Sequence, residues 1–149
     1  AKPQLNPDAT QESPMTIELS LDRTATLAQT VHIRSHTLVS DITEAEGGDD
    51  AGPSPHDLYD AALGACKALT VMWYARKKGI PVDDIHTRIE RDESEERKGV
   101  YRLSATLSVQ GSLTDAQLQE LQAVAQKCPV HKLMSTVTTE ITTTLGRLP

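Results

Sequence analysis

The chain has 149 residues, of which 38% are apolar, so it is long enough for one domain with a real hydrophobic core. Its formal net charge of −6 and its lack of Phe disfavour a nucleic-acid or anionic-membrane partner, whether held by charge or by base stacking. Residues 1–14 lack the features of a signal peptide, and no apolar run approaches the roughly 20 residues of a membrane span. We expect a soluble, cytoplasmic protein with a loosely packed tail over 1–14 and a single domain over 15–149.

The pattern after this tail is typical of strands. Ile17, Leu19 and Leu21 alternate with polar residues, and we expect further strands over 24–33 and 37–42. The Gly- and Asp-rich stretch 46–54 predicts a loop.

A helix is predicted to begin at Ser54-Pro-His-Asp57. Ser54 fits the N-cap, Pro55 the first helical position and Asp57 the third position of a capping box. A basic stretch followed by Gly79 marks the expected end. Apolar residues recur at helical spacing, and we expect them to face the core together with Cys66: Leu58, Ala62, Ala65, Leu69, Met72 and Trp73.

The second half of the chain repeats the mixture of strands and helix. Alternating apolar residues predict strands over 85–89 and 101–109, joined by a charged connection over 91–99. A capping box at Thr114 opens a helix that we expect to reach about Cys128, and alternation over 137–145 predicts a final strand. This order favours an α+β class with an antiparallel sheet.

Cys66 and Cys128 are the only cysteines, which is too few for a secreted disulfide scaffold. In a reducing cytosol they are either buried thiols or a catalytic pair. Cys66 lies about 16 Å from the predicted helix start, where the helix dipole is of little help. A reactive Cys66 therefore needs a cation from elsewhere, such as an arginine.

The surroundings of Cys128 leave two interpretations open. If the preceding helix ends at Cys128, the dipole disfavours a thiolate there, whereas a new helical turn starting at Pro129 would favour it. A third hypothesis, which we favour less, is a metal site made by Cys66, Cys128 and His131. We expect no bound metal.

Two segments of the chain resemble the OsmC/Ohr family. Gly52-Pro-Ser-Pro-His-Asp-Leu-Tyr-Asp-Ala-Ala-Leu-Gly-Ala-Cys66 is similar to the first-cysteine segment of that family, and Lys127-Cys-Pro-Val-His-Lys132 to the second. The resemblance extends over about 16–145 and is closest to the OsmC-like branch. It implies an OsmC-like fold, with antiparallel sheets packed on two main helices. It also implies an intertwined homodimer whose two active sites lie at the subunit interface.

The resemblance also implies a chemistry and a role in oxidative stress defence. Members of this family are thiol peroxidases that reduce organic hydroperoxides. Cys66 would be the peroxidatic cysteine and Cys128 the resolving one, which together form a disulfide. The pair would be reset by an external small dithiol or thiol protein, with no other cofactor.

The chain departs from the family pattern at His56. Classical members have Asn-Pro-Glu where this chain has Ser-Pro-His, and their glutamate holds an arginine against the reactive thiol. His56 and Asp57 therefore stand at or beside the glutamate position, and Arg34, with Arg23 as a second choice, is the candidate thiolate-stabilising arginine. His56 lies about 15 Å from Cys66 along a straight helix, so a role beside the thiol would need a second subunit or a bridging side chain.

This departure motivates an alternative function of a different class. The chain could be an OsmC-like ligand-binding or interaction protein that keeps the cysteines but has weak or no peroxidase activity.

Overall fold

The computed structural model of this protein describes residues 15–149, so the expected tail over 1–14 lies outside the described residues. Contacts divide the chain into two compact units, a first unit ending at Asp57 and a second unit from Leu58 to Pro149. Each unit is described by itself below. A single domain over 15–149 stays a prediction.

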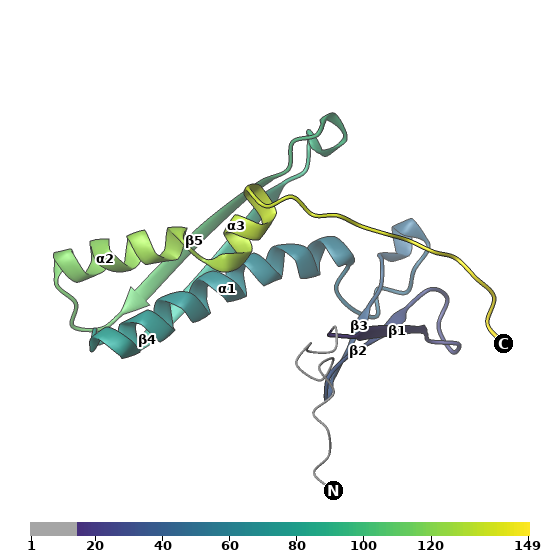
Figure 1. Ribbon diagram of the computed structural model, residues 1–149, viewed down its shortest axis with the longest axis horizontal. Helices are drawn as coiled ribbons and strands as arrows, with labels where there is room; N and C mark the ends of the chain where they lie inside the picture. The colour runs from purple at the N-terminus through teal and green to yellow at the C-terminus, as the bar shows by residue number, and fades with distance from the viewer. Residues whose placement is uncertain (1–14) are drawn as a thin grey trace, which may run out of the picture. The chain divides into compact units, whose positions relative to one another are not determined.

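The first unit contains a three-stranded antiparallel sheet in the order β1-β2-β3 (Figure 1). Its strands are β1 (Ile17–Leu21), β2 (Gln29–Ile33) and β3 (His36–Ser40). Ile33 lies opposite His36, so that β2 and β3 are joined by a two-residue loop. Arg34 opens this loop with a φ of 54°, a conformation that such hairpin loops require and that bulky side chains adopt rarely.

The second strand is shorter than the predicted 24–33, because a turn occupies its first residues. The carboxylate of Asp22 accepts hydrogen bonds from the amide and the hydroxyl of Thr24, at 2.9 and 2.6 Å. The backbone amide of Ala25 also donates to the carbonyl of Asp22. This Asp-centred turn delays the strand until Gln29.

The predicted loop over 46–54 is confirmed, and Asp41 organises it. The Asp41 carboxylate accepts backbone hydrogen bonds from Ile42 (2.8 Å), Asp49 (3.1 Å) and Ala51 (3.1 Å). These bonds, with that from Ala51 the largest contribution, hold the pKa of Asp41 below its ordinary value. The loop begins with a short 3₁₀ turn, η2 (Glu44–Glu46).

Helix α1 (Pro55–Lys78) has the predicted start and end. The side chain of Ser54 and the backbone amide of Asp57 are hydrogen-bonded, and the amide of Ser54 donates to the Asp57 carboxylate. Both bonds of the capping box are therefore present. Gly79 follows the helix with a φ of 67°, in the left-handed conformation typical of a helix C-terminus.

The second unit combines a two-stranded sheet with helices (Figure 1). Strands β4 (Asp84–Asp92) and β5 (Arg102–Gln110) pair antiparallel, and their connection contains the short turn η3 (Glu96–Lys98). Two helices follow, α2 (Asp115–Gln126) and α3 (Pro129–Ser135). The predicted capping box opens α2, since Thr114 and Gln117 exchange hydrogen bonds of 3.0 and 3.1 Å.

The core of the second unit lies between these helices and the hairpin. It is built from Val71 and Ala75 of α1, Ile80, and Leu121 of α2. A Cβ atom on Gly64 would lie only 2.9 Å from Cγ1 of Ile89, so a glycine is what lets α1 approach β4 this closely.

The prediction for the buried face of α1 is wrong for the single chain. Leu69 and Trp73 of the predicted core stripe are 70% and 62% exposed. The buried face is another one, made of Asp60, Leu63, Gly64, Lys67, Val71 and Ala75. Because α1 is apolar on two faces, its periodicity could not indicate which one packs on the sheet. Cys66 lies between the two faces and is half-buried.

The predicted final strand over 137–145 is not formed in the single chain. The chain continues from α3 without a further helix or strand (Figure 1). Ile141 and Leu145 are 82% and 101% exposed, so the alternating pattern has no strand or core to pack against. No helix in residues 15–149 has the length and hydropathy that crossing a bilayer demands.

Candidate active site

Cys66 and Cys128 lie together in the second unit, and both are free thiols. Cys66 is on α1 and is half-buried, whereas Cys128, between α2 and α3, is completely inaccessible to solvent. Their sulfur atoms accept hydrogen bonds from the consecutive backbone amides of Val130 and His131, so the two thiols are close neighbours. The fold therefore brings together two thiols that are far apart in the sequence.

Backbone amides at the start of α3 donate hydrogen bonds to both sulfur atoms. Helix α2 ends at Gln126, and Cys128 is the N-cap of α3, with Pro129 at the first helical position. Of the two interpretations left open by the sequence, the one with a new helix at Pro129 is confirmed. The amide of His131 donates to Sγ of Cys128 (3.3 Å), and the amide of Val130 donates to Sγ of Cys66 (3.4 Å).

The surroundings of Cys128 keep its thiol protonated. Burial is the largest effect and raises the pKa of Cys128, and the hydrogen bond with Cys66 raises it further. The amide of His131 and the positive charge of Lys67 act in the opposite direction but do not cancel this rise. The expectation that a new helix at Pro129 would favour a thiolate at Cys128 is therefore wrong, because burial outweighs the effect of the helix start.

Lys67, which sequence reasoning missed, is buried next to this pair. Its Nζ donates to the carbonyl oxygen of Ala125 in α2 (2.8 Å) and lies 2.9 Å from Nδ1 of His131. Since an ammonium group can only donate, Nδ1 is the acceptor and the ring proton of His131 is on Nε2. A signal was present in the sequence, because Lys67 is the only charged residue between Asp60 and Arg76.

A cavity of about 640 Å³ lies beside Lys67 and His131, which both line it. Its wall combines polar surface with a similar amount of apolar surface from α1, β5 and α2, including Leu63, Val71, Leu103, Leu107 and Leu121. A cavity of this size with a few polar groups is typical of a binding site for a small organic molecule.

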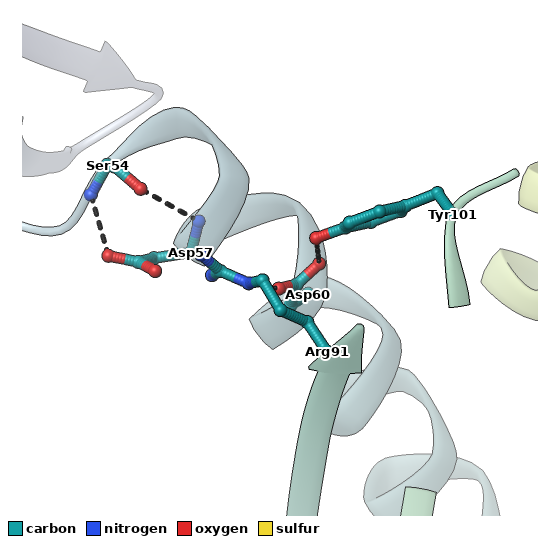
Figure 2. Close-up of polar contacts among 5 residues, drawn as sticks. All are labelled: Ser54, Asp57, Asp60, Arg91 and Tyr101. Atoms are coloured by element: carbon teal, nitrogen blue, oxygen red, sulfur yellow. Dashed lines mark hydrogen bonds and ion pairs between the residues drawn. The ribbon is translucent and has the colours of Figure 1, made fainter. Parts of the chain in front are cut away.

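Asp60 joins α1 to the ends of both strands of the hairpin (Figure 2). Its carboxylate binds Nε of Arg91 at 2.5 Å and accepts a hydrogen bond from the hydroxyl of Tyr101 at 2.6 Å. Burial and the bond to Asp60 raise the pKa of Tyr101. The sequence analysis singled out none of these three residues, because their contacts link distant parts of the chain.

The remaining predicted site residues belong to the first unit. Asp57 has the capping role described above, which Figure 2 shows as two bonds with Ser54. His56 is exposed in the first turn of α1, and Arg34 is in the β2–β3 loop. Their roles beside the thiols stay predictions.

The hypothesis of a metal site finds no support in the described part of the chain. No group of three His, Cys, Asp or Glu side chains within residues 15–149 is placed to hold a metal ion. Nδ1 of His131, one of the proposed ligand atoms, accepts a hydrogen bond from Lys67 instead.

A family model described as OsmC-like protein matches residues 47–144, a segment that includes both cysteines and Lys67. This chain belongs to the OsmC family. The resemblance stated from the sequence is therefore confirmed.

Solved structures of the OsmC family share its α+β fold. An OsmC-like protein from Mycoplasma pneumoniae has a TM-score of 0.66 at 16% identity, with 85% of this chain and 90% of that one covered. An organic hydroperoxide resistance protein OsmC from Legionella pneumophila has a TM-score of 0.61 at 17% identity, covering 84% and 93%. The organic hydroperoxide resistance protein OhrB of Bacillus subtilis has a TM-score of 0.53 at 23% identity, covering 81% and 90%.

No curated protein sequence matches this chain. At these identities the solved structures establish the fold alone. The expected OsmC-like class, with antiparallel sheets and α1 and α2 as its main helices, agrees with them, and α3 is an additional short helix.

Proposed function

We propose that this OsmC family member is a thiol peroxidase that reduces organic hydroperoxides in defence against oxidative stress. Cys66 is the nucleophile and Cys128 the resolving thiol. The observation that carries the proposal is that a half-buried thiol and a fully buried one accept hydrogen bonds from the consecutive backbone amides of Val130 and His131. A peroxide can reach the first, and the second is in place to react with the product.

The proposed reaction has two chemical steps. The Cys66 thiolate attacks one oxygen of the hydroperoxide, the O–O bond breaks, and the alkoxide takes a proton and leaves as an alcohol. Cys66 is then a sulfenic acid. Cys128 attacks this sulfur and loses its proton, and the hydroxyl group leaves as water when the disulfide forms. An external dithiol or thiol protein reduces the disulfide by exchange.

The hydrogen bonds around the sulfurs support this division of roles. The sulfur of half-buried Cys66 accepts a hydrogen bond from the amide of Val130. Cys128, whose pKa is raised, keeps its proton until the second step.

The cavity beside Lys67 supports an organic substrate, and neither cysteine is among the residues that line it. Its walls offer apolar side chains to an alkyl or aryl group, which a hydrogen peroxide molecule lacks. The cavity is also what favours the second candidate function, an OsmC-like ligand-binding protein with weak or no peroxidase activity.

Two features of the single chain support a homodimer with interface active sites. The outward face of α1 exposes Leu69 and Trp73 next to half-buried Cys66. The segment after α3 has the alternation of a strand without a strand to pair with. A second copy of the chain would bury the outward face of α1 and would provide a strand that pairs with the segment after α3.

A turnover assay with cumene hydroperoxide and a dithiol reductant tests the proposed function. We expect Cys66→Ser to lose turnover by at least about a hundredfold, because the nucleophile is removed. Cys128→Ser is the matched control: it should still consume one equivalent of peroxide per chain in a single turnover. Unchanged turnover in Cys66→Ser would make the thiol incidental and would favour the ligand-binding protein.

A further inference from the structure

Lys67 is a buried cation whose two acceptors are both uncharged, the carbonyl oxygen of Ala125 and Nδ1 of His131. None of the ion pairs found within residues 15–149 includes it. An ammonium group that is withdrawn from water is costly unless a nearby negative charge compensates it. We therefore expect a group that can become negatively charged close to Lys67.

The carboxylate nearest in sequence on the same face of α1 is that of Asp60. It lies two helical turns away, about 10 Å along the axis, and is already bound by Arg91 and Tyr101. Asp60 therefore cannot be the direct partner of Lys67.

Within residues 15–149, the other elements that line the cavity beside Lys67 contribute no carboxylate to its wall. Helix α2 contributes a backbone carbonyl and the neutral side chains of Gln122 and Gln126 to the same cavity wall, and β5 contributes apolar residues. Tyr59 and Tyr101 line this cavity as well, and α3 contributes His131. The remaining groups that can become negative are the two thiols.

The thiols are linked to Lys67 through short paths. Cys66 precedes it in α1, and the sulfur of Cys66 accepts a hydrogen bond from the amide of Val130, the residue before His131. His131 connects Lys67 to Cys128, because its ring accepts from Nζ while its backbone amide donates to Sγ of Cys128.

We propose that Lys67 is a positioning residue that compensates the negative charge of the thiol pair, first with Cys66 as the thiolate and then with Cys128 as it attacks. The role of Lys67 in a catalytic cycle rests on the proposed peroxidase function. The charge compensation itself does not require a peroxide. Sequence reasoning assigned such a role to an arginine from the first strands. Lys67 supplies a cation from within the second unit.

The positive charge of Lys67 lowers the pKa of Cys128 and so opposes the effect of burial. This is the effect that the resolving step needs, because Cys128 must give up its proton when it attacks the sulfenic acid.

A purely structural role for Lys67 is the alternative to be excluded. Its bond to the carbonyl of Ala125 satisfies an acceptor in the last turn of α2, which would stabilise that helix end whatever the state of the thiols. Lys67→Gln separates the two roles, because an amide group can still donate a hydrogen bond but carries no charge. Lys67→Arg keeps the charge.

The test measures alkylation of Cys66 in the reduced protein by iodoacetamide from acid to alkaline pH, followed by mass spectrometry, and the formation of thiolates over the same range by ultraviolet absorbance. We expect Lys67→Gln to shift both pH profiles to higher pH and to slow alkylation at neutral pH about tenfold. Lys67→Met, which fills a similar volume, should behave in the same way, and Lys67→Arg should restore most of the rate.

Lys132→Met is the matched control, because it removes an exposed lysine of α3 and changes the net charge equally. Its profile should stay close to that of the wild type. Profiles of Lys67→Gln and Lys67→Met that coincide with the wild type, with only the melting temperature lowered, would overturn the proposal. Because no peroxide is used, this result is independent of whether the protein has peroxidase activity.

Discussion

Two charged side chains, Asp60 and Lys67, are buried on the same face of α1 and are compensated in different ways. Asp60 has a cation and a hydroxyl donor from the hairpin. Lys67 has two neutral acceptors, the carbonyl oxygen of Ala125 and Nδ1 of His131. The first arrangement holds secondary structure elements together, whereas the second leaves the Lys67 ammonium without a carboxylate among the partners found in residues 15–149.

The pair of Asp60 and Arg91 should be important for stability. The side chain of Asp60 is only 8% exposed, so Arg91→Met leaves a buried carboxylate without its cation. We expect the free energy of unfolding to fall by about 3 kcal/mol, measured by urea denaturation.

Arg88→Met is the control for this experiment. Arg88 pairs with Glu90 at 2.8 Å on the same strand, but both side chains are more than half exposed, at 69% and 61%. Its loss should cost less than about 1 kcal/mol. Equal losses for the two variants would contradict a structural role for the buried pair.

At the scale of the residue, the sequence allowed the thiols to be predicted but not their surroundings. Cys66 and Cys128 were found because cysteines are rare in this chain and lie in recognisable segments. The contacts of Lys67 with Ala125 and His131 connect parts of the chain far apart in sequence, and no local pattern encodes them.

At the scale of the element, local signals gave the correct helix starts. The two capping boxes, at Ser54 and at Thr114, involve only residues within one turn, so the sequence contains all the information needed. The hairpin of β4 and β5 was also predicted, because its alternation is regular on both strands. Such elements are determined mainly by their own residues.

Two parts of the chain were predicted less well than these local elements. The outward face of α1 and the segment over 137–145 both have the pattern of buried structure, yet both are exposed in the single chain. The sequence pattern cannot tell whether a segment is covered by its own chain or by another surface. Under the proposed homodimer, both discrepancies would have one physical reason, namely that the second copy supplies the covering surface.

At the scale of the whole molecule, the exposed face of α1 predicts self-association. We expect the wild type to elute as a dimer and Trp73→Asp as a monomer, because a carboxylate in the centre of an apolar contact is costly to desolvate. Size-exclusion chromatography with light scattering measures the molar mass directly.

Gln119→Asp, on the exposed face of α2, adds the same charge away from this surface and should remain dimeric. A monomeric wild type, or a Trp73→Asp variant that stays dimeric, would exclude α1 as the interface. If the monomer also loses peroxide turnover, the active sites depend on the second copy.

The central claim is that peroxide converts the thiol pair into a disulfide. Reduced protein treated with one equivalent of cumene hydroperoxide should lose both free thiols of each chain. Mass spectrometry of a digest without reductant should then find the peptides of Cys66 and Cys128 joined. Two thiols that remain fully titratable after an excess of peroxide would contradict this account.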